Sequence, residues 1–143
     1  MIGKYLVKSV EETKHLASNF AKQAKSGDVI ALLGNLGTGK TTFTQGFAAA
    51  LGVSESVGSP TFKLISEYMG TELALFHIDC YRLENVQQFI NIGGEEYLEH
   101  RNGVTLIEWA DIIADILPMD TYYLNINRLT ENENYRAIRI YKK

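Results

Sequence analysis

The chain has 143 residues, of which 45% are hydrophobic and 22% charged, with a net charge of −3 at pH 7. This composition predicts one domain over residues 1–143 and disfavours bulk electrostatic binding of DNA or RNA, although a local basic patch remains compatible with it. No apolar run reaches the ~18 residues of a membrane span, and the start lacks the apolar stretch of a secretory signal, so we expect a cytoplasmic protein without a membrane partner.

The N-terminal half predicts helices around a short buried strand. Ser9 and Glu12 fit a capping box that opens a helix. The run DVIALL at 28–33 is short and apolar, which is typical of a buried strand. In chain order the expected elements are an edge strand at 4–8, a helix from Ser9 to Gly27, the strand at 28–33, and a helix at 40–51 with Phe43, Phe47 and Ala50 inward.

The C-terminal half predicts two hairpins. The expected elements are strands at 62–69 and 73–79, helical pieces at 84–100 broken at Gly93-Gly94, a strand at 104–107, a helix at 110–116, and strands at 121–127 and 135–141 joined by the polar turn TENEN. Cys80 is the one cysteine, which excludes a disulfide framework and a thiolate zinc cluster. We expect its thiol to be buried and inert.

Residues Gly34 to Thr42, GNLGTGKTT, match the phosphate-loop (Walker A) pattern G-x-x-x-x-G-K-[ST] in full. Glycines allow positive φ and a close approach of backbone to phosphate, and successive N–H groups with the following helix terminus bind an anion. Lys40 is expected to reach the β- and γ-phosphates, and the Thr41 hydroxyl is a ligand suited to Mg²⁺. The expected nucleotide-binding residues are Asn35, Leu36, Gly37, Thr38, Gly39, Lys40, Thr41 and Thr42.

Acidic residues end two apolar runs and are candidates to complete a catalytic and metal site. We expect Asp79 to hold the magnesium shell through a water, and Glu108 to ligate the metal or polarise the attacking water. The alternatives are a turn-capping Asp and a solvated Glu. Thr61, in the segment SPTF, is a candidate γ-phosphate sensor, although spacing alone favours an ordinary loop. His77 lies two residues before Asp79 and so shares its strand face, in a structural or a site role.

These segments together resemble the TsaE family, the small bacterial ATPases of tRNA threonylcarbamoyladenosine biosynthesis. The resemblance covers nearly the whole chain and rests on four segments: GNLGTGKTTFTQGFAAALG at 34–52, SPTFKLISEY at 59–68, FHIDCYRL at 76–83 and IEWAD at 107–111. The predicted elements already favour a single mixed sheet of about seven strands with helices on both faces. With the resemblance we expect a single-domain P-loop NTPase fold of the α/β class, whose sheet is mainly parallel.

The resemblance also implies site residues and partners. It implies that the protein binds ATP/ADP with Mg²⁺ and that the segment near Ser9 and Glu12 approaches the base. It also implies that Trp109 lies near the active site, whereas spacing alone leaves a packing role for this residue equally open. It implies weak ATP hydrolysis that depends on the partner proteins TsaD and TsaB. Their complex modifies tRNAs that read codons beginning with A. The TsaE-like subunit resets that complex, and its contact with tRNA is expected to be indirect.

Three other functions use the same loop. A small-molecule P-loop kinase needs an acceptor pocket and usually an arginine-bearing lid, and no Arg-rich insertion stands out among the five arginines. A GTPase switch reads guanine with an N-K-x-D stretch, which this sequence lacks. A binding module without hydrolysis would retain nucleotide but show no turnover.

Overall fold

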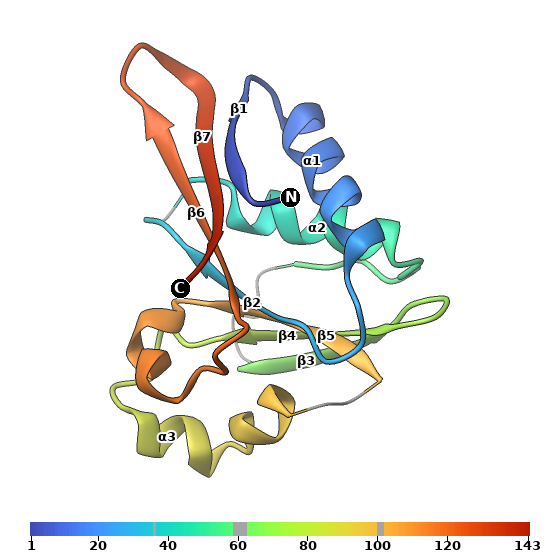
Figure 1. Ribbon diagram of the computed structural model, residues 1–143, viewed down its shortest axis with the longest axis vertical. Helices are drawn as coiled ribbons and strands as arrows, with labels where there is room; N and C mark the ends of the chain where they lie inside the picture. The colour runs from blue at the N-terminus through green and yellow to red at the C-terminus, as the bar shows by residue number, and fades with distance from the viewer. Residues whose placement is uncertain (36, 59–62, 100–101) are drawn as a thin grey trace.

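The protein is described by a computed structural model over residues 1–35, 37–58, 63–99 and 102–143. In these residues a seven-stranded sheet has the order β1-β7-β6-β2-β5-β4-β3 (Figure 1). The strands are β1 (Gly3–Val7), β2 (Val29–Leu33), β3 (Ile65–Met69), β4 (Ala74–Asp79), β5 (Gly103–Glu108), β6 (Tyr122–Leu129) and β7 (Asn132–Lys142).

The central strands of the sheet are parallel and its margins are antiparallel. β2 lies between β5 and β6 and is parallel to both, and β4 is parallel to β5. The pairs β1–β7, β6–β7 and β3–β4 are antiparallel. Strands β1, β2, β4, β5 and β6 therefore run in one direction and only β3 and β7 oppose them among the described strands, which confirms the predicted mixed, mainly parallel sheet.

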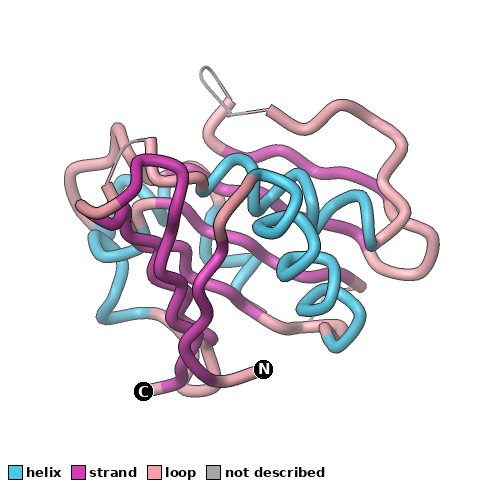
Figure 2. The backbone as a smooth tube through the Cα atoms, turned by 90° about the horizontal axis from the view of Figure 1, so that it is seen from above, coloured by secondary structure: helices cyan, strands magenta, loops and turns pink. Residues whose placement is uncertain are grey.

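Helices cover both faces of the sheet, as predicted (Figures 1 and 2). They are α1 (Val10–Gln23), α2 (Lys40–Ala50), α3 (Val86–Asn91) and the 3-10 helices η1 (Gly94–Leu98) and η2 (Ala110–Ile116). α1 and α2 pack on one face, where their buried residues join one core cluster. α3 and η2 contribute to a second cluster on the opposite face.

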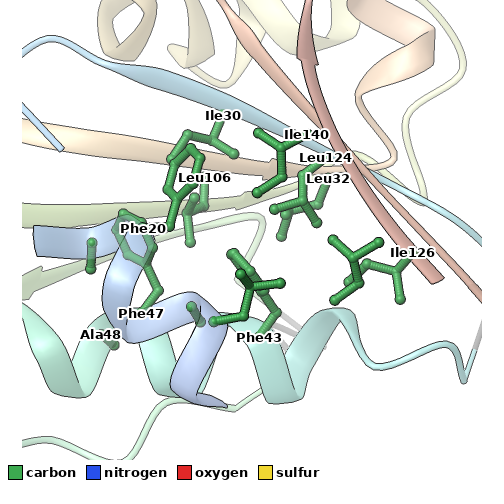
Figure 3. Packing of buried hydrophobic residues seen from close by; sticks show 14 of the residues in the cluster. Phe20, Ile30, Leu32, Phe43, Phe47, Ala48, Leu106, Leu124, Ile126 and Ile140 are labelled. Atoms are coloured by element: carbon green, nitrogen blue, oxygen red, sulfur yellow. The ribbon is translucent and has the colours of Figure 1, made fainter. Parts of the chain in front are cut away.

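Aromatic side chains fill the core between the α1–α2 pair and the sheet (Figure 3). Phe43 and Phe47 of α2 are fully buried and stack with ring centroids 6.3 Å apart. Phe20 of α1 meets Phe43 edge-on at 6.5 Å. A fully buried aromatic of this size contributes roughly 1.5–3 kcal/mol relative to an exposed one. This packing fixes the first turn of α2, and hence the loop before it, against β2.

Three details of the predicted helices are decided by the structure. The Ser9 hydroxyl accepts a hydrogen bond from Glu12 N at 3.1 Å, which confirms the predicted start of α1. The expectation that Ala50 faces inward is wrong, because it lies in the last turn of α2, beyond the edge of the core, and is exposed. The segment 110–116 is a 3-10 helix with a kink at Ile113.

The C-terminal hairpin is longer than its apolar pattern indicated. β6 continues to Leu129 and β7 begins at Asn132, and these two residues are register partners. The polar run TENEN is therefore not a five-residue turn, since its last part belongs to β7. Polar residues extend the strands here because the hairpin tip projects beyond the helices (Figure 1), so alternation with apolar residues stops. Pairing resumes at the tip after a register shift between Arg128 and Leu129.

Candidate functional site

Three neighbouring parallel strands end together at one edge of the sheet. Glu108, the last residue of β5, pairs with Leu32 of β2 and with Asp79, the last residue of β4. The loop from Gly34 follows β2 at the same edge. The structure thus brings Asp79 and Glu108 beside the phosphate loop, and ligands of open α/β sheets bind at this carboxyl edge of the strands.

The phosphate loop uses glycines where positive φ is required. Gly34, Gly37 and Gly39 have φ of 137°, 75° and 111°, and a Cβ on Gly34 would lie 2.5 Å from Ile126 O. The Thr38 hydroxyl closes the loop with a hydrogen bond to Asn35 O at 2.9 Å. Leu36 lies outside the described residues.

Lys40 opens α2 and is almost completely buried, with 5% exposure. Its ammonium donates a hydrogen bond to Gly34 O at 2.7 Å and lies 3.9 Å from the centroid of the Trp109 ring. Burial lowers the pKa of Lys40, and the charges of Glu108, Asp79 and then Asp111 oppose that shift. The lysine side chain therefore folds back to the first residue of the loop, and three nearby carboxylates favour its charged form.

Trp109 follows β5 directly in a left-handed conformation, with φ 56° and ψ 42°. Such a conformation costs roughly 1–2 kcal/mol for a residue with a side chain. Its ring contacts the Lys40 ammonium on one side and the Tyr81 ring, at 5.0 Å between centroids, on another. The sequence left packing and a site role equally open, and the structure places the ring at the candidate site.

The two carboxylates have different surroundings. Glu108 is buried, and its Oε2 lies 2.7 Å from Nε2 of His77, which has no exposure. Asp79 is half-buried and its Oδ1 accepts a hydrogen bond from Tyr81 N at 2.9 Å. Burial raises the pKa of Asp79, with the neighbouring Glu108 charge adding to the shift and the Tyr81 N–H opposing it. His77 is thus the partner of a candidate catalytic carboxylate.

The remaining predicted residues are placed with less detail. Thr41 and Thr42 lie in the first turn of α2 and are partly exposed. Ser9 and Glu12 lie at the start of α1, where the Ser9 hydroxyl caps the helix. Thr61 falls outside the described residues, so its predicted sensor role stays a prediction.

Sequence reasoning missed three charged side chains near the loop. Arg128 and Arg136 donate to the carbonyls of Gly37 and Thr38. Asp111 lines a cavity of about 290 Å³ together with Leu33, Gly34, Asn35, Trp109, Asn125 and Asn127. The inward alternation of β6 through Leu124 and Ile126 was the available signal for Arg128, because the next residue on that face is 128.

A buried strand, a glycine-rich loop that ends in a lysine, and a helix that opens on that lysine define a domain of the P-loop NTPase class. The model of the family described as threonylcarbamoyl adenosine biosynthesis protein TsaE matches residues 7–138. The chain therefore belongs to the TsaE family, as its resemblance indicated. TsaE proteins act in tRNA threonylcarbamoyladenosine biosynthesis.

Individual relatives agree with the family. The TsaE protein of Bacillus subtilis (strain 168) is 46% identical over 123 residues, covering 86% of this chain and 76% of the relative. That of Aquifex aeolicus is 35% identical and covers all of this chain and 98% of the relative. A crystal structure of Bacillus subtilis YdiB superposes with a TM-score of 0.81 at 40% identity, covering 98% of this chain and 86% of that one. Among the described residues, no helix has the length and apolar character needed to cross a membrane.

Proposed function

We propose that this protein binds ATP with Mg²⁺ and hydrolyses it as an accessory subunit of the complex that forms threonylcarbamoyladenosine in tRNAs reading codons that begin with A. Hydrolysis would be weak in the isolated subunit and depend on TsaD and TsaB, and it would reset the complex between turnovers. The protein would work in the cytoplasm and contact tRNA indirectly. The names of the relatives support the pathway, and the site geometry supports the chemistry.

The observation that carries the proposal is the meeting of the phosphate loop with two acidic strand ends. Lys40 would neutralise charge on the β- and γ-phosphates, and the loop N–H groups would hold the phosphate oxygens. Glu108 would orient and polarise the attacking water. His77 fixes one of its oxygens by a 2.7 Å contact, which limits the rotation of the carboxylate.

The residues present fit a magnesium ion. Thr41, Asp79 and Glu108 supply only oxygen ligands, which Mg²⁺ prefers. In the described part of the chain no three His, Cys, Asp or Glu side chains gather into a metal cage. A magnesium ion usually relies on one or two carboxylates together with water and substrate phosphates. Bound there, the ion would neutralise charge that develops on the phosphates.

The edge of the site offers a surface for a protein partner. Tyr81 is 55% exposed and packs on Trp109, which in turn contacts Lys40. A partner that covers Tyr81 would therefore act on the phosphate-binding lysine through two ring contacts. This arrangement supports turnover that depends on a partner.

The proposal is tested by ATP hydrolysis with and without purified TsaD and TsaB. We expect stimulation by the partners in the wild type, its loss in Glu108→Gln with nucleotide binding retained, and weakened triphosphate binding in Lys40→Ala. Hydrolysis that rises only with a small-molecule acceptor, with phosphate transferred to it, would show a kinase instead. Tighter binding of GTP than ATP would overturn the assignment of the base.

A further inference from the structure

Two arginines of the β6–β7 hairpin hold consecutive carbonyls of the phosphate loop. Arg128 donates to Gly37 O from Nε at 3.0 Å and from Nη2 at 2.7 Å. Arg136 donates to Thr38 O from Nε at 2.9 Å. The two arginines are register partners across the hairpin, so they project from the same face. The hairpin therefore contacts the loop through residues that are far apart in the sequence. The separation is 91 residues for Arg128 and Gly37, and 98 residues for Arg136 and Thr38.

These contacts determine where the loop N–H groups point. A trans peptide unit is planar, and its C=O and N–H point in opposite directions, and the described residues contain no cis peptide bond. Holding Gly37 O toward Arg128 turns the N–H of Thr38 away from the hairpin. Holding Thr38 O toward Arg136 does the same for the N–H of Gly39. Both N–H groups belong to the run that forms the anion nest.

The charges of this pair also favour an anionic ligand. Like charges directly opposite each other in an antiparallel pair are destabilising. Within the described residues neither Arg128 nor Arg136 forms an ion pair, so neither guanidinium is neutralised by a carboxylate there. A Cβ on Gly37 would lie 2.9 Å from Arg128 Nη2, so a side chain at this position would displace the guanidinium from the loop. A polyanion in the loop would offset the repulsion between the two cations.

We propose that Arg128 and Arg136 are positioning residues that orient the N–H groups of Thr38 and Gly39 for binding the polyphosphate chain. The inference rests on the proposed function, since the anion is taken to be the phosphates of the nucleotide. Because the orientation exists before the ligand arrives, the binding step does not have to order these two peptide units.

The test compares Arg128→Gln, Arg136→Gln and Arg128→Lys with the matched control Arg139→Gln. Arg139 lies on the same hairpin, is exposed and stacks on Tyr141 with its guanidinium carbon 4.5 Å from the ring centroid. The measurements are the amide ¹H–¹⁵N signals of Thr38 and Gly39 without ligand, the affinities for Mg²⁺-pyrophosphate and Mg²⁺-ATP, and the melting temperature.

We expect Arg128→Gln to move the Thr38 signal, Arg136→Gln to move the Gly39 signal, and each to weaken pyrophosphate binding about tenfold, which equals ~1.4 kcal/mol. Arg128→Lys should restore part of the affinity, because it keeps the charge but loses the two-donor fork. Arg139→Gln should leave all three measurements near the wild type. If one glutamine variant does not fold, the other still tests its own peptide unit.

Three results would overturn the proposal. Weaker binding with unmoved amide signals would mean that the arginines touch phosphate directly. If Arg128→Lys regains the full affinity for pyrophosphate while the Thr38 amide signal stays unmoved, the arginine acts only through a positive charge at that position. If Arg139→Gln loses as much affinity as the other variants, the effect reflects only the net charge of the protein. If the wild type binds neither ATP nor pyrophosphate, the proposed function fails, whereas the ligand-free amide signals still test the orientation of the loop.

Discussion

Lys40 and Trp109 are in direct contact, with the lysine ammonium 3.9 Å from the centroid of the indole ring. The same ammonium donates to Gly34 O, so one cation links the start of the phosphate loop to the residue after β5. Cation–π contacts of this kind stabilise by ~0.5–2 kcal/mol. Phosphates that bind the Lys40 ammonium would compete with both contacts. The environment of the Trp109 ring should therefore report on phosphate binding.

The fluorescence of Trp109 should therefore change when ATP and Mg²⁺ are added. The chain has one tryptophan, so emission excited at wavelengths that its eight tyrosines do not absorb belongs to this residue alone. We expect saturable changes in emission maximum and intensity, because the cation over the ring is redistributed. Lys40→Met should change the starting spectrum and lose the response. An invariant spectrum at ATP concentrations where calorimetry shows binding would contradict this role of the contact.

The left-handed backbone of Trp109 predicts an unusual order of stability between two variants. Trp109→Ala and Trp109→Gly both lose the ring, but only glycine relieves a cost of roughly 1–2 kcal/mol. Part of this gain in stability is offset, because glycine raises the conformational entropy of the unfolded chain. We expect the glycine variant to be more stable by up to about 1 kcal/mol in urea unfolding.

Ala49 provides the control for that comparison, since it is exposed and helical within α2. Ala49→Gly, in the last turn of α2, should cost up to ~1 kcal/mol, so that alanine is more stable than glycine as is normal for a right-handed helix. The same order at position 109, with alanine clearly more stable than glycine, would show that the backbone of Trp109 is not left-handed in solution.

The buried pair of His77 and Glu108 predicts that two substitutions of the glutamate differ in stability and agree in activity. Glu108→Gln keeps an acceptor for a histidine that has no exposure. Glu108→Ala leaves His77 Nε2 unpaired, beside an Nδ1 that already lacks a partner within the described residues. We expect the alanine variant to be less stable by ~1–3 kcal/mol, and neither to show partner-stimulated hydrolysis. Equal urea midpoints would argue against the pair.

Asp79 should make the fold more stable as the pH falls. Burial and the Glu108 charge raise its pKa in the folded protein, so the native state binds its proton more tightly than the unfolded chain. The gain in folding stability from binding this proton grows as the pH falls through the folded pKa. It is absent in Asp79→Asn, whose side-chain oxygen can still accept the hydrogen bond from Tyr81 N. We expect the variant to be at least as stable as the wild type near neutral pH.

The measurement is the melting temperature of both proteins from about pH 8 to about pH 4. The advantage of Asp79→Asn should shrink toward acid pH, whereas Asp115→Asn, at an exposed carboxylate, should follow the wild type. A variant advantage that grows on acidification would reverse the sign and show that Asp79 is stabilised as its anion.

Local patterns were sufficient to predict the centre of this fold. β2, the phosphate loop and α2 are consecutive, and their apolar run, glycines and helix start are visible within about 20 residues of sequence. Asp79 and Glu108 were found because each ends an apolar run, and parallel strands place such ends at one edge. The family resemblance then supplied the pathway, which no local pattern encodes.

Contacts between distant segments were not predictable in this way. Alternation assigns His77 to a face of β4, but its contact with Glu108 depends on the register between strands. The hydrogen bond from Arg128 to Gly37 joins residues that are 91 positions apart in the sequence. It forms because the hairpin extends beyond its apolar part. The backbone of Trp109 has no composition signal, because left-handed residues are usually glycine or asparagine.

Cys80 should react with thiol reagents far more slowly than an ordinary cysteine. Burial, with a smaller contribution from the Asp79 charge, raises the pKa of its thiol to about 12, and only the thiolate is nucleophilic. At pH 8 the thiolate fraction should fall roughly 10³-fold below that of an unperturbed thiol, before its 1% exposure slows access further. Alkylation followed by mass spectrometry should therefore be slow in the native protein and fast in urea. Asp79→Asn should accelerate the native reaction because it removes a charge that disfavours the thiolate, and rapid labelling of the native wild type would show that the carboxyl end of β4 opens readily.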